Sequence, residues 1–174
     1  MEWLNDFLAW AWGQHHNVLS WYIRPLFLLP FCYFAYRRSL LGISLTLFAL
    51  ATSMFWFPKP EQPDPKVLEF LAMEKAHLTG DWTLSKTLLT LLVPISLAAL
   101  ALAFWKRSVI LGLVVMDALA LGKVAWSFYY GGMAGGSVIA SPALAGLVIC
   151  NVVVLLVARR SRGGIAARAG RPID

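Results

Sequence analysis

Five long apolar stretches occupy most of this 174-residue chain, and they constrain its fold more than any other feature. Each stretch is close to the roughly 20 residues that a helix needs to cross about 30 Å of hydrocarbon. The stretches are continuous and do not alternate with polar residues, so they predict helices rather than the strands of a membrane barrel. The predicted spans are residues 18–36, 40–57, 87–105, 109–130 and 138–158.

The overall composition agrees with these spans. Hydrophobic residues make up 59% of the chain and charged residues only 14%, whereas about a quarter of the residues in a typical soluble domain are charged. This balance excludes a soluble core. The sequence therefore predicts an all-α integral membrane protein that forms one polytopic domain over residues 1–174.

The basic residues predict how the chain is oriented. Nine of them fall on one side of the membrane if the N-terminus is outside: Arg37, Arg38, Lys106, Arg107, Arg159, Arg160, Arg162, Arg168 and Arg171. The positive-inside rule makes that side cytoplasmic. We expect a bacterial-type plasma (inner) membrane, an outer N-terminus and a basic cytoplasmic tail at 159–174. The net charge of +6 then requires no nucleic acid, although the tail also suits anionic lipid headgroups.

Two short amphipathic helices are predicted on the outer face. In the N-terminal segment, apolar residues recur at helical spacing from Trp3 to Ala11. The outer loop, 58–86, begins with four prolines and continues with a helical pattern that ends near Gly80. The apolar face of that pattern comprises Val67, Phe70, Leu71 and Leu78. The glycine-rich segment 131–136 joins two spans and predicts a tight outer turn.

A shift of 69 residues suggests an internal repeat. It places Pro25 on Pro94 and the dipeptide Arg38-Ser39 on Arg107-Ser108. If real, this duplication makes two like-oriented helical hairpins, spans one–two and three–four, followed by a single C-terminal helix. We expect the first and third spans to bend at their prolines.

Four polar residues inside the spans are expensive in lipid and are expected to face the bundle interior: Arg24, Asp117, Lys123 and Asn151. From the rise along each helix, Asp117 and Asn151 lie at one depth, and Ser44 and Thr46 reach a similar depth. The sequence predicts a polar cluster of these four. Both cysteines, Cys32 and Cys150, lie inside spans and are expected to be packing residues.

Arg24 and Lys123 lie level with each other near the outer surface. Two like charges at one depth predict a shared cavity that holds an anion, either a lipid phosphate or a carboxylate such as Glu69 or Glu74. The alternative for Lys123 is that it snorkels outward to the interface.

The outer face also offers weak candidates for a metal site. Glu74 and His77 have a Glu-x-x-His spacing, and His15 and His16 lie on the same side of the membrane. Hydrated surface residues are the alternative interpretation of these four. No catalytic motif is present and no cofactor is required by the sequence.

Three functions fit these features. The first is a non-catalytic subunit or assembly factor of a membrane complex, with a membrane-protein partner or a second copy of the chain. The second is a small transporter or lipid-handling protein for an anionic substrate, since parallel repeats occur in transporters. The third is a metal-dependent membrane enzyme that uses the outer His and Glu residues.

Overall fold

The computed structural model describes the backbone of residues 2–169, and this part of the chain is helical without strands. The side chains of Asn5, of residues 134–135 and of residues beyond Arg160 are outside the described set, as is all of Arg171. The elements are α1 (Glu2–Gln14), α2 (Val18–Ile23), η1 (Arg24–Phe27), α3 (Leu28–Tyr36), α4 (Leu40–Thr52), η2 (Ser53–Phe55), α5 (Pro65–Thr79), α6 (Leu84–Trp105) and α7 (Val109–Ala169).

Four helical segments are long and apolar enough to cross a membrane: Val18–Tyr36, Leu84–Trp105, Val109–Met133 and Gly136–Arg160. The all-helical class is thus confirmed, and the four apolar helices fit a membrane protein. The segment Leu40–Phe55, which contains α4 and η2, is apolar but shorter. A fifth crossing at 40–57 therefore remains a prediction.

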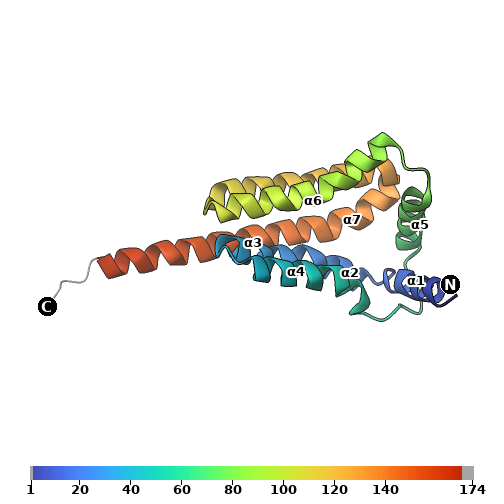
Figure 1. Cartoon of the computed structure of the whole chain (residues 1–174), viewed down its shortest axis with the longest axis horizontal. Helices are drawn as coiled ribbons and strands as arrows, with labels where there is room; N and C mark the ends of the chain where they lie inside the picture. Colours follow the sequence, from blue (N-terminus) through green and yellow to red (C-terminus); the bar gives the residue numbers. More distant parts are fainter. Residues whose placement is uncertain (1, 170–174) are drawn as a thin grey trace.

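Helix α7 contains two of these segments because it reverses direction at Gly132. This glycine has φ 61° and ψ −161°, a conformation that a residue with a side chain rarely adopts. We call Val109–Met133 the first arm and Gly136–Arg160 the second arm of α7. The second arm runs back beside the first and continues as helix past the rest of the bundle (Figure 1). The predicted turn at 131–136 is present, and the predicted tail is helical as far as Ala169.

The first spanning segment is interrupted at Pro25. The α-helical hydrogen bonding gives way to the short 3-10 turn η1 and resumes in α3, because proline has no amide hydrogen to donate. Gly146 of the second arm packs against this break, where a Cβ atom would lie only 2.2 Å from Cβ of Pro25. By contrast, α6 continues as one helix through Pro94, so only the first of the two prolines interrupts its helix.

The main core lies where α3, α6 and both arms of α7 meet. Its buried members are Phe31, Cys32, Ala35, Leu100, Phe104, Met116 and Cys150. Both cysteines are free and buried, as expected of packing residues. The Cys150 thiol also lies 3.5 Å from the carbonyl oxygen of Pro25.

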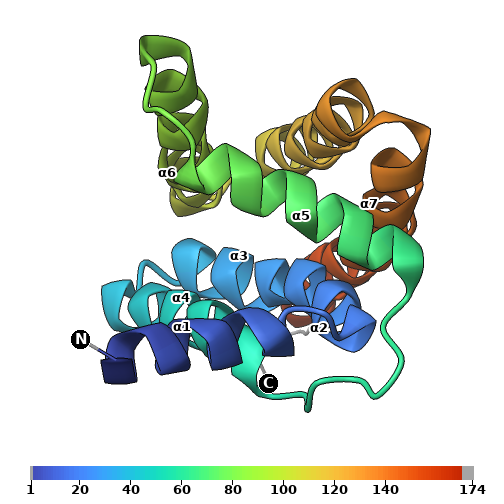
Figure 2. The ribbon, with the colours of Figure 1, turned by 90° about the vertical axis from the view of Figure 1, so that its right-hand side faces the viewer.

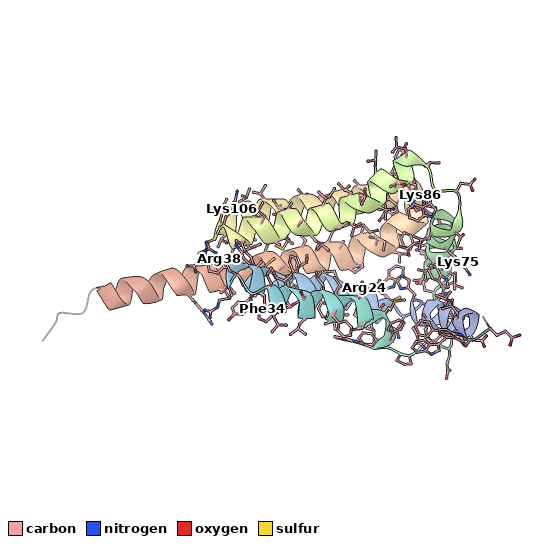
Figure 3. All side chains as sticks on the ribbon, in the orientation of Figure 1. Arg24, Phe34, Arg38, Lys75, Lys86 and Lys106 are labelled. Atoms are coloured by element: carbon pink, nitrogen blue, oxygen red, sulfur yellow. The ribbon has the colours of Figure 1, made fainter. Side chains whose placement is uncertain are left out.

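The two ends of the bundle differ in composition. One end, which we call the basic end, carries the turns α3–α4 and α6–α7. In these turns Arg38 and Arg107 have φ 57° and 58°. Arg38 Nε donates to the Trp105 carbonyl at 3.2 Å, and the Arg107 guanidinium lies 5.7 Å from the Tyr36 ring centroid. Figure 3 shows Arg38 and Lys106 at this end, far from Lys75 and Lys86.

The other end, which we call the α5 end, is covered by α5. This helix lies across the bundle, with α6 on one side and α1 on the other (Figure 2). Of its predicted apolar face, Val67, Phe70 and Leu71 are buried, and they pack with Trp21; only Leu78 is exposed, at 47%.

Both ends of α5 are closed by side chains that satisfy its terminal backbone groups. Asp64 accepts from the Lys66 amide at 2.8 Å and precedes Pro65, the first helical residue. At the other end, Lys86 Nζ donates to the carbonyl oxygens of Leu78 at 3.3 Å and Gly80 at 2.6 Å. These caps and the buried face fix the position of α5 over the bundle.

Candidate functional site

Four ionisable side chains from four different segments surround one cavity at the α5 end. They are His15, just after α1, Arg24 of η1, Glu74 of α5 and Lys123 of the first arm of α7. The cavity has a volume of about 250 Å³, and its apolar wall includes Trp21, Phe70 and Pro142. The structure thus places Arg24 and Lys123 on a common cavity, together with one of the two carboxylates named from the sequence.

Local structure explains why these residues meet. Phe70 and Glu74 are one helical turn apart, so the face that buries Phe70 also directs Glu74 toward the cavity. Arg24 begins the 3-10 turn that Pro25 imposes. His15 lies in the turn after α1, where its carbonyl oxygen accepts from the Trp21 indole at 3.0 Å.

His15 connects the cation of η1 to the carboxylate of α5. Arg24 Nη2 lies 3.1 Å from His15 Nδ1, and His15 Nε2 lies 3.6 Å from Glu74 Oε2. A guanidinium can only donate, so Nδ1 must accept and be unprotonated. In the neutral ring the proton is then on Nε2, which is directed at Glu74. The three side chains form a polar chain across α1, η1 and α5.

The environment favours the ionised form of Glu74. Burial raises the pKa of this carboxyl, but the contact with His15 and the charges of Lys123 and Arg24 together lower its pKa below the ordinary value. The side chain is 29% exposed and that of His15 is 14% exposed. Glu74 is therefore the anion that the two cations share.

Lys123 lies at the edge of the cavity and not inside it. The residue is exposed, and its ammonium lies 4.5 Å from the centroid of the Trp126 ring, one turn further along α7. Both interpretations of Lys123 therefore describe part of its environment, because it borders the cavity and also contacts an aromatic residue near the α5 end.

The predicted polar cluster within the spans is only partly present. Asn151 Nδ2 donates to Asp117 Oδ1 at 2.7 Å and to the Leu147 carbonyl at 2.9 Å, which joins the two arms of α7. Among the described residues, Ser44 and Thr46 form no hydrogen bond with this pair. Thr46 donates to the Gly42 carbonyl at 2.8 Å, and Ser44 is exposed. Asp117 and Asn151, which lie at equal depth, are therefore in contact, whereas the α4 hydroxyls at a similar depth do not contact them.

The geometry gives no support to the metal site. In the described part of the chain, no three His, Cys, Asp or Glu side chains lie close enough to hold a metal ion. His16 Nδ1 lies 2.9 Å from the Gly13 carbonyl, and the His77 ring packs against Trp126 and Tyr130. Of the four candidates, only His15 and Glu74 meet.

The role of His15 could not be seen in the sequence. The sequence suggests either a weak metal ligand or a hydrated surface residue at His15, whereas His15 bridges Arg24 and Glu74. The sequence signal that could have suggested this bridge is the complementary chemistry of Arg24, His15 and Glu74, which were all predicted near the outer side. Comparisons with protein-family models, curated proteins and solved structures found no match, so the function must be argued from the site itself.

Proposed function

We propose that this protein is a non-catalytic accessory or assembly subunit of a membrane complex. The observation that carries the proposal is that the costly polar groups near and within the spans contact one another and hold the protein's own helices together. Arg24, His15 and Glu74 connect α5 to the bundle, and Asp117 with Asn151 joins the arms of α7. In this proposal these contacts are structural, and they present a rigid α5 end to a partner.

The proposed partner surface is α1 and the adjoining part of the α5 end. In the described part of α1, large apolar side chains are exposed, including Trp3 at 72% and Leu8 at 54%. Phe55 of η2 packs against Phe7 and Trp10, which fixes α1 against the bundle while leaving this surface free. An interfacial helix of this kind either lies on lipid headgroups or meets another membrane protein.

The proposed topology has five crossings, with the N-terminus outside and the C-terminus in the cytoplasm of a bacterial-type cell. At 1.5 Å per residue, Leu40–Phe55 spans roughly 24 Å, which is short of the hydrocarbon thickness by an amount that local bilayer thinning accommodates. Its two ends support the crossing, since it begins beside Arg38 at the basic end and ends against α1. Reporter fusions after Gly136 and after Arg162 should be located outside and in the cytoplasm, respectively. If both report one side, this topology is wrong.

The proposed repeat of two like-oriented hairpins is supported by the turns at the basic end. Besides the matching φ angles of Arg38 and Arg107, the amide of Ser39 donates to the carbonyl five residues earlier, and the amide of Ser108 does the same. Both serine hydroxyls then accept from the amide three residues later. Matching turns at one end are what a duplicated hairpin would produce.

A transporter or lipid-handling protein for an anionic substrate is the second candidate. The cavity at the α5 end favours it, because two cations face a single carboxylate there. An external anion could then compete with Glu74 for Arg24 and Lys123. The accessory role is preferred because Glu74 already lowers the electrostatic need for such an anion.

Two measurements distinguish the accessory subunit from the transporter: co-purification of a partner in mild detergent and anion flux in vesicles. We expect a membrane protein to co-purify in fixed stoichiometry, and the double change Trp3→Ala with Leu8→Ala to release it. Leu92→Ala, which removes an exposed side chain of α6, is the control and should leave it bound. Loss of the partner in the control as well, or absence of any partner together with anion flux in vesicles, would contradict the proposal.

A further inference from the structure

A second cavity lies at the basic end, away from the site discussed above. Its volume is about 840 Å³, within the range of roughly 300–1,000 Å³ typical of ligand cavities. The walls come from α3, from the end of α6, from the α6–α7 turn with the first residues of α7, and from the second arm of α7. The apolar surface of these walls includes Leu29, Tyr33, Phe104, Val154 and Ala158. The cavity therefore offers space for an apolar chain between helices that are themselves suited to a bilayer.

One rim of this cavity is polar and positively charged. Lys106, Arg107 and Ser108, all from the α6–α7 turn, contribute to its lining. The left-handed backbone of Arg107 is held by the hydrogen bond from its amide to the Phe104 carbonyl at 2.8 Å. Its guanidinium lies over Tyr36, another lining residue. The turn therefore holds two cations at the mouth of an apolar cavity.

These cations differ from those at the α5 end because no carboxylate accompanies them. Asp117 is the only acidic residue between positions 87 and 160, and it is bonded to Asn151. No acidic residue occurs between positions 24 and 57. In the described part of the chain the basic end thus has cations with no internal counter-charge, beside an apolar space.

We propose that this cavity binds one acidic phospholipid. The apolar walls would take an acyl chain, and Lys106 and Arg107 would pair with the anionic headgroup. Charge complementarity selects an acidic lipid, because each Lys or Arg near the membrane surface favours anionic lipid by about 1 kcal/mol. Binding here is separate from the accessory role and does not depend on a protein partner.

The test compares lipid retention by the whole chain reconstituted in phosphatidylcholine vesicles with and without phosphatidylglycerol. After extraction in mild detergent, native mass spectrometry counts each lipid per protein. We expect one phosphatidylglycerol to be retained in preference to phosphatidylcholine. Lys106→Gln and Arg107→Gln should each weaken that preference about five-fold, the factor that corresponds to about 1 kcal/mol.

Arg37→Gln is the matched control. Arg37 lies in the equivalent α3–α4 turn and is exposed, but it does not line the cavity, so the lipid preference should stay within two-fold of wild type (about 0.4 kcal/mol). Equal losses from Arg37→Gln and Arg107→Gln would mean diffuse attraction to a basic surface and would overturn the proposal. Equal retention of both lipids by wild type would overturn it as well.

Two further variants keep the proposal testable if a neutral variant fails to fold. Arg107→Lys keeps the charge and should retain the preference. Ala158→Phe adds a ring to the wall of the cavity and should reduce retention of the lipid without changing the charge at the rim. Unchanged phosphatidylglycerol retention by a folded Ala158→Phe protein would show that the lipid is bound elsewhere and would overturn the proposal.

Discussion

The two ends of this molecule treat positive charge in opposite ways. At the α5 end, Arg24 and Lys123 share a cavity of about 250 Å³ with Glu74, a carboxylate from the helix that covers them. At the basic end, Lys106 and Arg107 line a cavity of about 840 Å³ whose walls hold no carboxylate. In our proposals, the first arrangement balances its charge within the protein, whereas the second takes an external anion, the headgroup of an acidic phospholipid.

The difference follows from where the acidic residues fall in the chain. Apart from Asp117, every Asp and Glu of the described residues lies in α1, in α5 or in the segments that flank α5. An internal counter-charge offsets much of the free energy that a cation loses when it is removed from water. A cation without such a partner must instead be stabilised by solvent or by lipid. The same substitution should therefore have different consequences at the two ends.

Glu74→Gln should produce the largest effect. It leaves Arg24 and Lys123 without their shared carboxylate and replaces the charged acceptor that His15 faces with a neutral amide. We expect a loss of about 1–3 kcal/mol of stability, less than the roughly 3–5 kcal/mol of a fully buried pair, because Glu74 is 29% exposed. Thermal unfolding in detergent measures this change.

Two further variants make this result specific. Glu69→Gln alters an exposed carboxylate of the same helix and should change stability by less than about 0.5 kcal/mol. The double variant Arg24→Gln with Glu74→Gln should lose less stability than the sum of the two single variants. The reason is that Arg24→Gln then removes a charge that Glu74→Gln has already left without its partner. Additive costs would mean that Glu74 does not act through Arg24.

Asp117→Leu should have the next largest effect, since Asp117 is the polar link within the spans and lies at neither end. The change removes one acceptor of Asn151, whose Nδ2 keeps the Leu147 carbonyl. We expect a loss of about 1–2 kcal/mol. Asp117→Asn can still hydrogen-bond with Asn151 and should retain most of the folded yield.

The same pair of variants separates structure from proton-coupled transport. A structural Asp117 predicts that folded yield falls for Leu and is largely kept for Asn. If a flux of anions is found in vesicles and both variants abolish it while remaining folded, Asp117 has a functional role, and the accessory proposal loses its main support.

The pH dependence of stability should differ between wild type and Glu74→Gln. Because the folded-state pKa of Glu74 lies below its ordinary value of 4.5, its contribution is fully present above that value. The contribution is lost as the pH falls through the lowered pKa. The gap between the melting temperatures of wild type and Glu74→Gln should therefore narrow below about pH 4.5 and stay constant above it. A gap that is independent of pH at acidic values would contradict an ionised Glu74.

The parts of the fold that could be predicted from the sequence are those that depend on position along one helix. The apolar period of α5 predicted its buried face, and the rise per residue placed Asp117 level with Asn151 and Arg24 level with Lys123. Depth alone does not set the direction in which a side chain points. Thr46 lies at the expected depth but donates to its own helix.

The parts that could not be predicted depend on contacts between distant segments. The turn after α1 brings His15 between Arg24 and Glu74, and no local pattern encodes that approach. The cavity at the basic end exists because the second arm of α7 passes beside α3 and the α6–α7 turn. The presence of this cavity depends on how these elements pack together. From the sequence, the basic residues at its rim predicted only the orientation of the chain in the membrane.

Among the residues that line the two cavities, the smallest expected effect on stability is that of Arg107 at the basic end. Arg107→Gln removes a cation that has no carboxylate nearby, so in lipid-free detergent it should cost at most about 0.5–1 kcal/mol, the value of its contact with Tyr36. Addition of phosphatidylglycerol should raise the melting temperature of wild type, because a ligand that binds only the folded state stabilises it. The rise should be smaller for Arg107→Gln and unchanged for Arg37→Gln. Arg24→Gln should show the reverse pattern, with a larger cost in lipid-free detergent and the wild-type response to the lipid. If Arg24→Gln also loses the lipid response, the two ends are not independent, and the cations at the α5 end contribute to lipid binding.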